Sequence, residues 1–277
     1  MKIAIAAVAK NEELYIQEWI DAYKKLGVNH FFIFDNNDIG NNSLAKVLYG
    51  NSDLNLIDVR GQEAFKSIGY QFGAYKYVYD NFKNDYDYIG FFDIDEFLHL
   101  YGMSIPEWLD KHKILQNADV IKFNWIMYGD NNLVYYDDRP VQERFLIANP
   151  PEQCNIKNFP DTYHTKCLVK CEKELIDGGP HNFILKDGIS TNTVGNIIPS
   201  ESPFSIPPTF KNGYIKHYST KTIQEYLFKK CKNLIDATGG YISLDDRLKS
   251  FFATNIYTEE KQKCIDSFLK DPQNYNI

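Results

Sequence analysis

The sequence predicts an α/β fold in which a mostly parallel sheet is flanked by helices. Two observations predict it. Short apolar runs of strand length alternate with longer segments whose apolar residues recur at helical spacing. The runs are apolar on both sides, which is typical of parallel strands that helices cover on both faces.

The first hundred residues hold the regular part of this pattern. The predicted strands are Lys2–Val8, His30–Phe34, Leu54–Val59 and Tyr88–Phe92. A helix is expected over Glu12–Leu26, with Gly27 as its C-cap. A second helix is expected over residues 65–82, where large apolar side chains recur every three or four residues.

The pattern is looser after residue 100, and we expect no second domain. The further elements expected are the helix Ile105–His112, the strands Val120–Trp125, Thr165–Lys170 and Gly213–Lys216, and the closing helices Ile223–Lys232 and Thr258–Leu269. The prediction is one domain over residues 1–277, with a regular half (1–100), an irregular half (101–218) and a helical segment (219–277).

Composition excludes several classes of protein. With 44% hydrophobic residues the chain of 277 residues is not disordered, and no apolar run is long enough to span a membrane. A net charge of −7 argues against nucleic-acid binding. We expect the N-terminal apolar stretch to be a strand rather than a signal peptide, and the five scattered cysteines to be reduced thiols in a cytoplasmic protein.

Polar residues follow each of the four predicted strands. They are Lys10-Asn11-Glu12, Asp35-Asn36-Asn37, Arg60-Gly61-Gln62 and Asp93-Ile94-Asp95. Ligands of parallel α/β sheets bind beyond the carboxyl ends of the strands. We therefore expect these residues to converge on one crevice.

Asp93 and Asp95 come directly after a buried strand. In an extended segment two such carboxylates point the same way, so that they can hold one divalent cation. Two unpaired carboxylates repel each other, which makes a cation their natural partner. The alternative is a helix N-cap followed by a surface charge.

Several motifs give the chain a specific resemblance. It resembles GT-A glycosyltransferases of the family-2-like group that overlaps family 92 (DUF23-type). The matching pieces, in the family's order, are Val8-Ala9-Lys10-Asn11-Glu12, Glu18-Trp19, residues 27–37, Gln71, residues 93–97, Phe123-Asn124-Trp125, Tyr128-Gly129 and Lys216-His217-Tyr218. The resemblance implies a Rossmann-like GT-A fold, a UDP-sugar donor, and Mn²⁺ or Mg²⁺ at the D-x-D motif.

The resemblance also implies roles for single residues. The donor-binding set is Ala7, Lys10, Asn11, Glu12, Asp35, Asn37, Gln71, Asp93, Ile94 and Lys229. The metal ligands are Asp93, Asp95 and His217. For Asp35 a turn-starting role is the alternative, for Gln71 a solvated amide, for Lys229 an ordinary basic helix face, and for His217 a structural histidine.

The acceptor side is less defined by the sequence. A general base is needed if the reaction inverts the anomeric centre, and Asp130 is our first candidate, with Glu143 and His181 in reserve. Trp125 and Tyr128 could stack on an acceptor sugar, although a strand Trp is more often part of a core. Lys166 is expected to face the same acceptor-side cleft as His181.

The resemblance implies a metal-dependent transferase that moves a UDP-linked sugar, with galactose a guess, to a saccharide hydroxyl with inversion. The expected setting is bacterial surface polysaccharide or lipopolysaccharide synthesis, with a saccharide or lipid-linked acceptor and peripheral contact with the inner face of the membrane. One alternative is a metal-dependent nucleotidyltransferase or sugar-phosphate hydrolase, but the Gly-rich phosphate loop of such nucleotidyltransferases is absent near Ala6–Lys10. A non-catalytic carbohydrate-binding homologue is the other.

Overall fold

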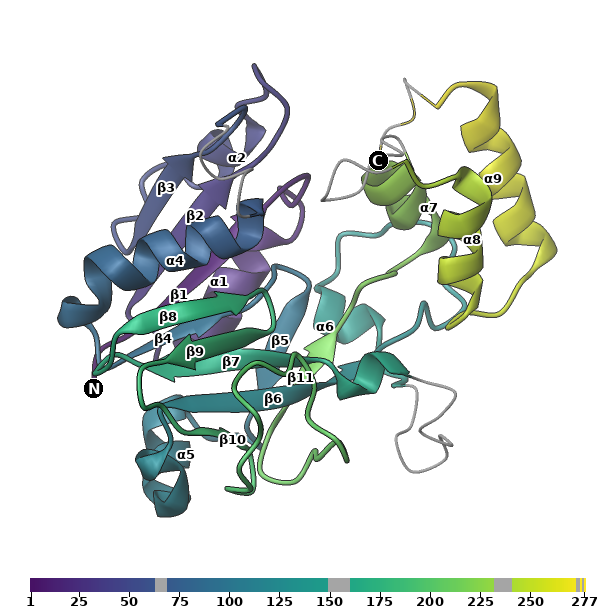
Figure 1. Cartoon of the computed structure of the whole chain (residues 1–277). Helices are drawn as coiled ribbons and strands as arrows, with labels where there is room; N and C mark the ends of the chain where they lie inside the picture. The colour runs from purple at the N-terminus through teal and green to yellow at the C-terminus, as the bar shows by residue number, and fades with distance from the viewer. Residues whose placement is uncertain (63–68, 149–159, 232–240, 273–274, 276) are drawn as a thin grey trace. The chain divides into compact units, whose positions relative to one another are not determined.

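The computed structural model describes residues 1–62, 69–148, 160–231, 241–272, 275 and 277. The chain forms two compact units (Figure 1). The first consists of Met1–Ile126 and Cys154–His217, and the second of Met127–Gln153 and Tyr218–Ile277. The single domain expected from the sequence stays a prediction, since two units of this kind also occur within one domain.

A nine-stranded sheet forms the centre of the first unit, as far as this unit is described. Its strands lie in the order β3-β2-β1-β4-β7-β6-β11-β5, and β10 pairs with β6. The strands are β1 (Ile3–Ala9), β2 (His30–Asp35), β3 (Leu54–Asp58), β4 (Tyr88–Phe91), β5 (Glu96–His99), β6 (Val120–Met127), β7 (Thr165–Lys170), β10 (Ser190–Asn192) and β11 (Tyr214–His217). A separate hairpin is made of β8 (Leu175–Gly179) and β9 (Asn182–Leu185).

The first four strands form the parallel half of the sheet. β1 runs parallel to β2 and β4, and β2 runs parallel to β3. The register aligns Ala9 with Asp35 and Asp35 with Asp58, so that the carboxyl ends of these strands meet along one edge. The predicted α/β fold is confirmed, and the four predicted strands are correct to within one residue at each end.

Helices cover both faces of the parallel half. The helices described in this unit are α1 (Ile16–Lys25), α2 (Ser43–Val47), α4 (Tyr70–Phe82) and α5 (Ile105–Lys111), with 3₁₀ turns at Lys83–Asp85, Lys113–Asn117 and Pro160–Tyr163. On one face, Trp19 and Tyr23 of α1 pack against Phe31 and Phe92. On the other, α4 and the β8–β9 hairpin bury a core with Phe91 and Phe183, whose rings stack 4.2 Å apart.

Among the predicted helices of this unit, α1 and α4 begin later than expected, whereas α5 begins at Ile105 as predicted. α1 begins at Ile16 instead of Glu12, because residues 10–15 form turns. α4 begins at Tyr70, and residues 65–68 of the predicted helix lie outside the described residues. Short strands β5, β8, β9 and β10 were not predicted.

Antiparallel pairing distinguishes the second half of the sheet. β7 runs antiparallel to β4 and to β6, and β11 runs antiparallel to β5. This pairing places β11 beside the segment that follows β4, and therefore beside the D-x-D motif.

The second unit is helical. Its helices are α6 (Val141–Arg144), α7 (Ile223–Tyr226), α8 (Leu244–Phe252) and α9 (Glu259–Lys270), and a π-helical turn (Leu227–Cys231) follows α7. Ile223, Phe251 and Phe268 share its apolar core. Both closing helices predicted from the sequence are confirmed, except that Lys232 lies outside the described residues, whereas α8 was not predicted.

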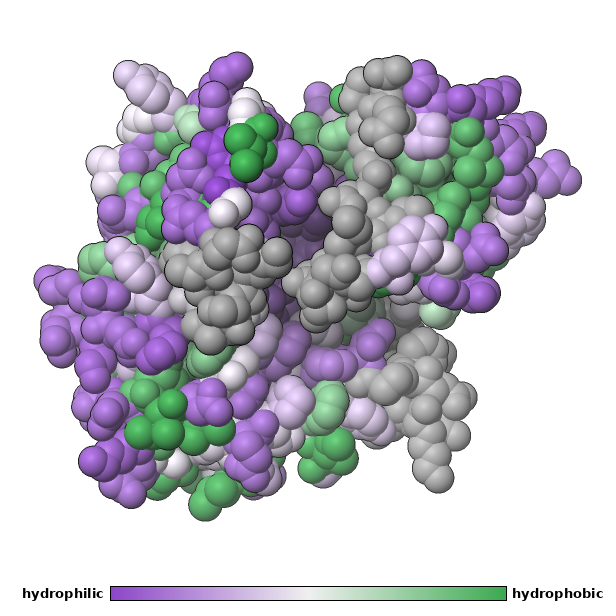
Figure 2. Space-filling view, turned by 45° about the horizontal axis from the view of Figure 1, so that its top comes forward, coloured by the Kyte–Doolittle hydropathy of each residue, from purple (hydrophilic) through white to green (hydrophobic). Residues whose placement is uncertain are grey.

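The surface view in Figure 2 shows hydrophilic residues over most of the face drawn, with apolar residues in small groups. None of the described helices combines the length and the apolarity that crossing a membrane requires.

Candidate functional site

The D-x-D motif forms a reverse turn at the carboxyl end of β4. The backbone N–H of Glu96 donates to the carbonyl of Asp93 at 3.0 Å, and the N–H of Asp93 donates to Oε2 of Glu96 at 3.0 Å. These reciprocal hydrogen bonds close the turn. The extended geometry expected from the sequence was therefore wrong, and Asp93 and Asp95 have different partners.

Asp93 is held by three side chains. Lys166 Nζ lies 3.0 Å from its Oδ2, the hydroxyl of Tyr75 donates to its Oδ1 at 3.1 Å, and Gln71 Nε2 donates to the same oxygen. Burial disfavours the charged carboxylate, but Lys166 outweighs this effect and lowers the pKa of Asp93. Gln71 is thus not a solvated amide, because α4 directs it to the D-x-D turn.

Lys166 is a fully buried ammonium on β7. It lies 3.9 Å from Oε2 of Glu96, which is fully buried on β5. Burial lowers the pKa of Lys166, yet Asp93 and Glu96 raise it more, so the ammonium stays charged. Burial raises the pKa of Glu96. Lys166 was expected to face the same cleft as His181, and the structure places its ammonium against Asp93 and Glu96.

Asp95 lies beside His217. Its Oδ1 is 3.6 Å from Nε2 of His217, and both residues are buried. Strand β11 places the histidine there, because its pairing with β5 sets His217 opposite Glu96. Within the described residues, Nδ1 of His217 has no hydrogen-bond partner.

Trp125 is surrounded by three histidines. Its ring lies 4.3 Å from His217, 5.0 Å from His164 and 5.2 Å from His181, measured between centroids. Its indole N–H and Nδ1 of His164 are buried without a hydrogen-bond partner among the described residues. The sequence reasoning missed His164, although a residue two positions before Lys166 on an extended segment points to the same side.

His181 lies in the turn between β8 and β9. Its Nδ1 is 2.9 Å from the carbonyl oxygen of Thr165. Because a carbonyl only accepts, Nδ1 carries the proton in the neutral imidazole and Nε2 keeps the lone pair. Burial, and then Lys166, lower the pKa of His181 to about 4.

The ends of β1 and β2 are joined by a hydrogen-bonded loop. Asp35 is buried and accepts from the N–H of Asn37 at 3.0 Å, while Asn37 Oδ1 accepts from the N–H of Asn11 at 2.7 Å. Asn11 has a φ of 55°, which this cross-connection stabilises. Burial raises the pKa of Asp35.

The other predicted donor residues of this unit lie nearby along the same strands. Ala7 is buried within β1, Ile94 is buried in the D-x-D turn, and Glu12 is buried after β1. Lys10 is 3.2 Å from Asp38 at the surface. Lys10, Glu12 and Ile94 follow the carboxyl ends of β1 and β4, and the crevice expected there stays a prediction.

Four predicted residues belong to the second unit. Asp130 is buried, its carboxylate pairs with Lys261 and accepts from the N–H of Asn132 at 2.8 Å, and its own N–H donates to Asn255 Oδ1 at 2.7 Å. Tyr128 packs on Tyr218 with ring centroids 4.8 Å apart. Glu143 lies in α6 and Lys229 in the π-helical turn.

Asp95 and His217 are the two residues that could hold a divalent cation beside the D-x-D turn. No three His, Cys, Asp or Glu side chains of the described residues are grouped to hold a metal ion. Mg²⁺ sites that bind phosphate substrates, however, use one or two carboxylates and complete their shell with phosphate and water oxygens. Here Asp95 would supply a carboxylate, and His217 would supply an imidazole nitrogen that lies 3.6 Å from it.

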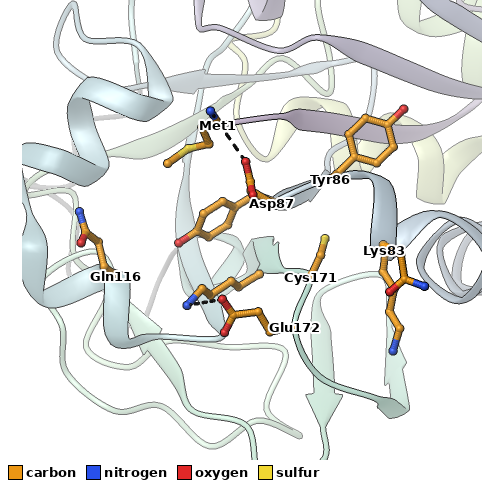
Figure 3. A pocket seen from close by; sticks show the side chains of 10 residues that line it. Met1, Lys83, Tyr86, Asp87, Gln116, Cys171 and Glu172 are labelled. Carbon is orange, nitrogen blue, oxygen red and sulfur yellow. Dashed lines mark ion pairs between the residues drawn. The ribbon is translucent and has the colours of Figure 1, made fainter.

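A pocket of about 660 Å³ lies near the amino-terminal ends of β1 and β4, away from the D-x-D turn (Figure 3). Met1, Asp87 and Glu172 are among the residues that line it, and ion pairs join Met1 to Asp87 and Lys170 to Glu172. It adjoins the start of β1 and β4, whereas the D-x-D turn follows the end of β4. We place the candidate functional site at the D-x-D turn, because charged side chains are buried there, whereas the ion pairs that line the pocket are exposed to solvent.

Comparisons with known proteins give one family. The family model of glycosyltransferase family 92 matches residues 3–178. A search of the curated proteins finds no match. Among solved structures, the galactosyltransferase LgtC in complex with donor and acceptor sugar analogs is similar over 61% of this chain and 58% of its own, with 16% identity and a TM-score of 0.29.

Proposed function

Because the chain belongs to glycosyltransferase family 92, we propose that it transfers a sugar from a nucleotide-sugar donor to a hydroxyl of a saccharide acceptor. The donor class we propose is a UDP-sugar, with UDP-galactose the first to test. The expected setting remains bacterial surface polysaccharide or lipopolysaccharide synthesis.

The pair formed by Asp95 and His217 carries this proposal. It joins a carboxylate and an imidazole at the carboxyl end of β4, where an α/β sheet binds ligands. A divalent cation bound there would neutralise the negative charge that develops on a leaving diphosphate. Neither a carbohydrate-binding module nor a structural protein needs such a pair.

The loop at the ends of β1 and β2 is the proposed nucleoside site. Asp35 is a buried acceptor that suits the N–H of uracil or a ribose hydroxyl, and Asn37 holds it in place. Because β1 runs parallel to β2 and β4, this loop and the D-x-D turn both follow the carboxyl ends of their strands, at the same end of the sheet.

For the general base we propose His181. Its Nε2 is the basic nitrogen, its imidazole is neutral at pH 7, and Trp125 lies between it and His217 in ring-contact distance of both. Asp130 was the first candidate from the sequence, but its carboxylate pairs with Lys261. Proton removal from the acceptor hydroxyl would accompany direct displacement at the anomeric carbon, with inversion.

Trp125 is the proposed contact for the acceptor sugar. Its indole N–H, together with Nδ1 of His164, offers buried hydrogen-bonding groups without a partner among the described residues. Sugars present both hydroxyls and an apolar C–H face, so an aromatic ring with a polar edge suits them.

The test is a screen of nucleotide sugars against the whole chain, with and without Mn²⁺. We expect UDP-sugars to raise the melting temperature only with Mn²⁺, and one of them to release UDP when saccharide acceptors are added. Release of pyrophosphate or of a sugar phosphate would favour the nucleotidyltransferase or hydrolase alternative. No response to any nucleotide sugar would contradict the proposal.

A further inference from the structure

We propose that Lys166 is a permanent cation of the D-x-D turn, which holds Asp93 out of the metal site and leaves Asp95 with His217 as the protein's divalent-cation ligands. This inference rests on the proposed function for the identity of the site. It departs from the sequence-based expectation that both carboxylates of the motif bind the metal.

The contacts of Asp93 carry the inference. Lys166 occupies its Oδ2 at 3.0 Å, and Tyr75 and Gln71 both donate to its Oδ1. To ligate a metal ion, Asp93 would have to break at least one of these contacts. Asp95, two residues later in the turn, instead directs its Oδ1 toward His217.

Lys166 has little freedom to withdraw from Asp93. β7 lies between β4 and β6, and the side chain of Lys166 is fully buried, with its register partner Phe123 on β6. Glu96, at 3.9 Å, is the second acid that faces the ammonium. A buried ammonium that left two carboxylates would lose several kcal/mol, so the pair persists.

The charge of the turn follows from this pairing. The ammonium of Lys166 neutralises the charge of Asp93. A divalent cation at Asp95 and His217 would be attracted by the carboxylates but repelled by this ammonium. The protein alone should therefore bind the cation weakly, and the diphosphate of the nucleotide should strengthen its binding.

The test is a titration of the whole chain with Mn²⁺, followed by the EPR signal of unbound Mn²⁺, in the presence of UDP. The decisive variant is the double substitution Lys166→Met with Asp93→Asn, which removes the ammonium together with the Asp93 carboxylate and leaves Glu96 in place. We expect its Mn²⁺ affinity to stay within about fivefold of the wild type, because Asp93 is not a ligand. A loss larger than that would overturn the inference, since it would show that the Asp93 carboxylate binds the metal.

The single substitutions should change the Mn²⁺ affinity in opposite directions. Lys166→Met should bind Mn²⁺ at least about tenfold more tightly, because the repulsion is removed and Asp93 becomes able to ligate. Asp95→Asn should lose at least about tenfold in affinity in every background. Unchanged or weaker binding by a folded Lys166→Met variant would contradict the inference.

Lys122→Met is the control for removing a buried ammonium. Lys122 is fully buried on β6, but its Nζ is held by three carbonyls, those of Pro199, Ser200 and Ser202. Its loss should reduce stability without changing Mn²⁺ affinity. If Lys166→Met does not fold, the double variant still decides the question, since it leaves one buried acid, Glu96, without the ammonium instead of two.

The failure of the proposed function would look different. In that case, no nucleotide sugar would be consumed by the wild type, while the pattern of Mn²⁺ affinities among these variants stayed as expected.

Discussion

Metal binding should depend most on the carboxylate of Asp95. Asp95→Asn keeps the size of the side chain and removes the charge that faces His217. We expect a loss of transfer activity of about 100-fold or more, because charge stabilisation of the leaving group is lost. The measurement is the rate of UDP release with the donor identified by the screen.

Asp110→Asn is the matched control, because Asp110 is an exposed carboxylate on α5. Both variants should melt within about 2 °C of the wild type, the range expected for a change below 1 kcal/mol. Wild-type activity of the Asp95→Asn variant would contradict the assignment of the metal ligand.

The lowered pKa of His181 predicts that the free energy of unfolding depends on pH. Its pKa is about 4 in the folded protein and about 6.5 in an unfolded chain, so only the unfolded state takes up a proton as the pH falls below 6.5. Stability due to this group is present above pH 6.5 and is lost as the pH falls toward 4. Between pH 7 and pH 5 we expect it to cost about 2 kcal/mol.

Urea denaturation at both pH values measures this effect. The His181→Gln variant has no such titration and keeps an amide that can donate to the Thr165 carbonyl. Its loss of stability between pH 7 and pH 5 should be smaller than that of the wild type by the same amount. Equal losses would show that His181 is protonated alike in both states.

At the scale of single elements, helix α7 depends on one buried ion pair. Arg144 of α6 donates to both carboxylate oxygens of Glu225 at 2.9 and 3.0 Å, and the two side chains are 1% exposed. Glu225 also closes a capping box with Thr222. Glu225→Gln should destabilise the protein by about 3 kcal/mol, because it removes the closer acid from a buried guanidinium and leaves Asp137, which lies 3.9 Å from Nε of Arg144.

Glu107→Gln separates capping from ion pairing. Glu107 holds the same position in the capping box of α5 with Ser104, but it is exposed. This variant should lose less than about 1 kcal/mol in urea denaturation. Similar losses in the two variants would assign the stability to the capping box alone.

Elements were predictable from the sequence where they were long or fully apolar. α4 and the strands β1 to β4 have strong helical or strand patterns, and their positions were predicted. β5, β8, β9 and β10 span only three to five residues, so they are too short to show a period. Their partners decide that they are strands, and those partners lie far away in the sequence.

The charge of the whole molecule leads to a further prediction. With 37 acidic and 30 basic residues, it should repel polyanions at most of its surface. We expect no binding of duplex DNA in a gel-shift assay at about 0.15 M salt, where non-specific binding needs many phosphate contacts. A salt-dependent shift at micromolar protein would contradict this prediction and would point to a basic patch.

For the molecule as a whole, the carboxyl edge of the sheet was predictable because parallel strand order follows from strand–helix alternation. The partners of Asp93 were not. The sequence shows two acids after a strand, but the turn that separates them is set by hydrogen bonds of Glu96. Lys166 comes from an antiparallel strand whose place beside β4 no local pattern encodes.

The pairing of β11 with β5 also sets an order of events during synthesis. The D-x-D turn leaves the ribosome long before His217, and the span matched by the family ends at residue 178, before β11 begins. A nascent chain can therefore assemble its parallel strands while the histidine of the metal pair has not yet been made. The proposed catalytic centre is completed among the last contacts of the first unit, which would keep a half-built protein from binding the proposed cation as the finished one would.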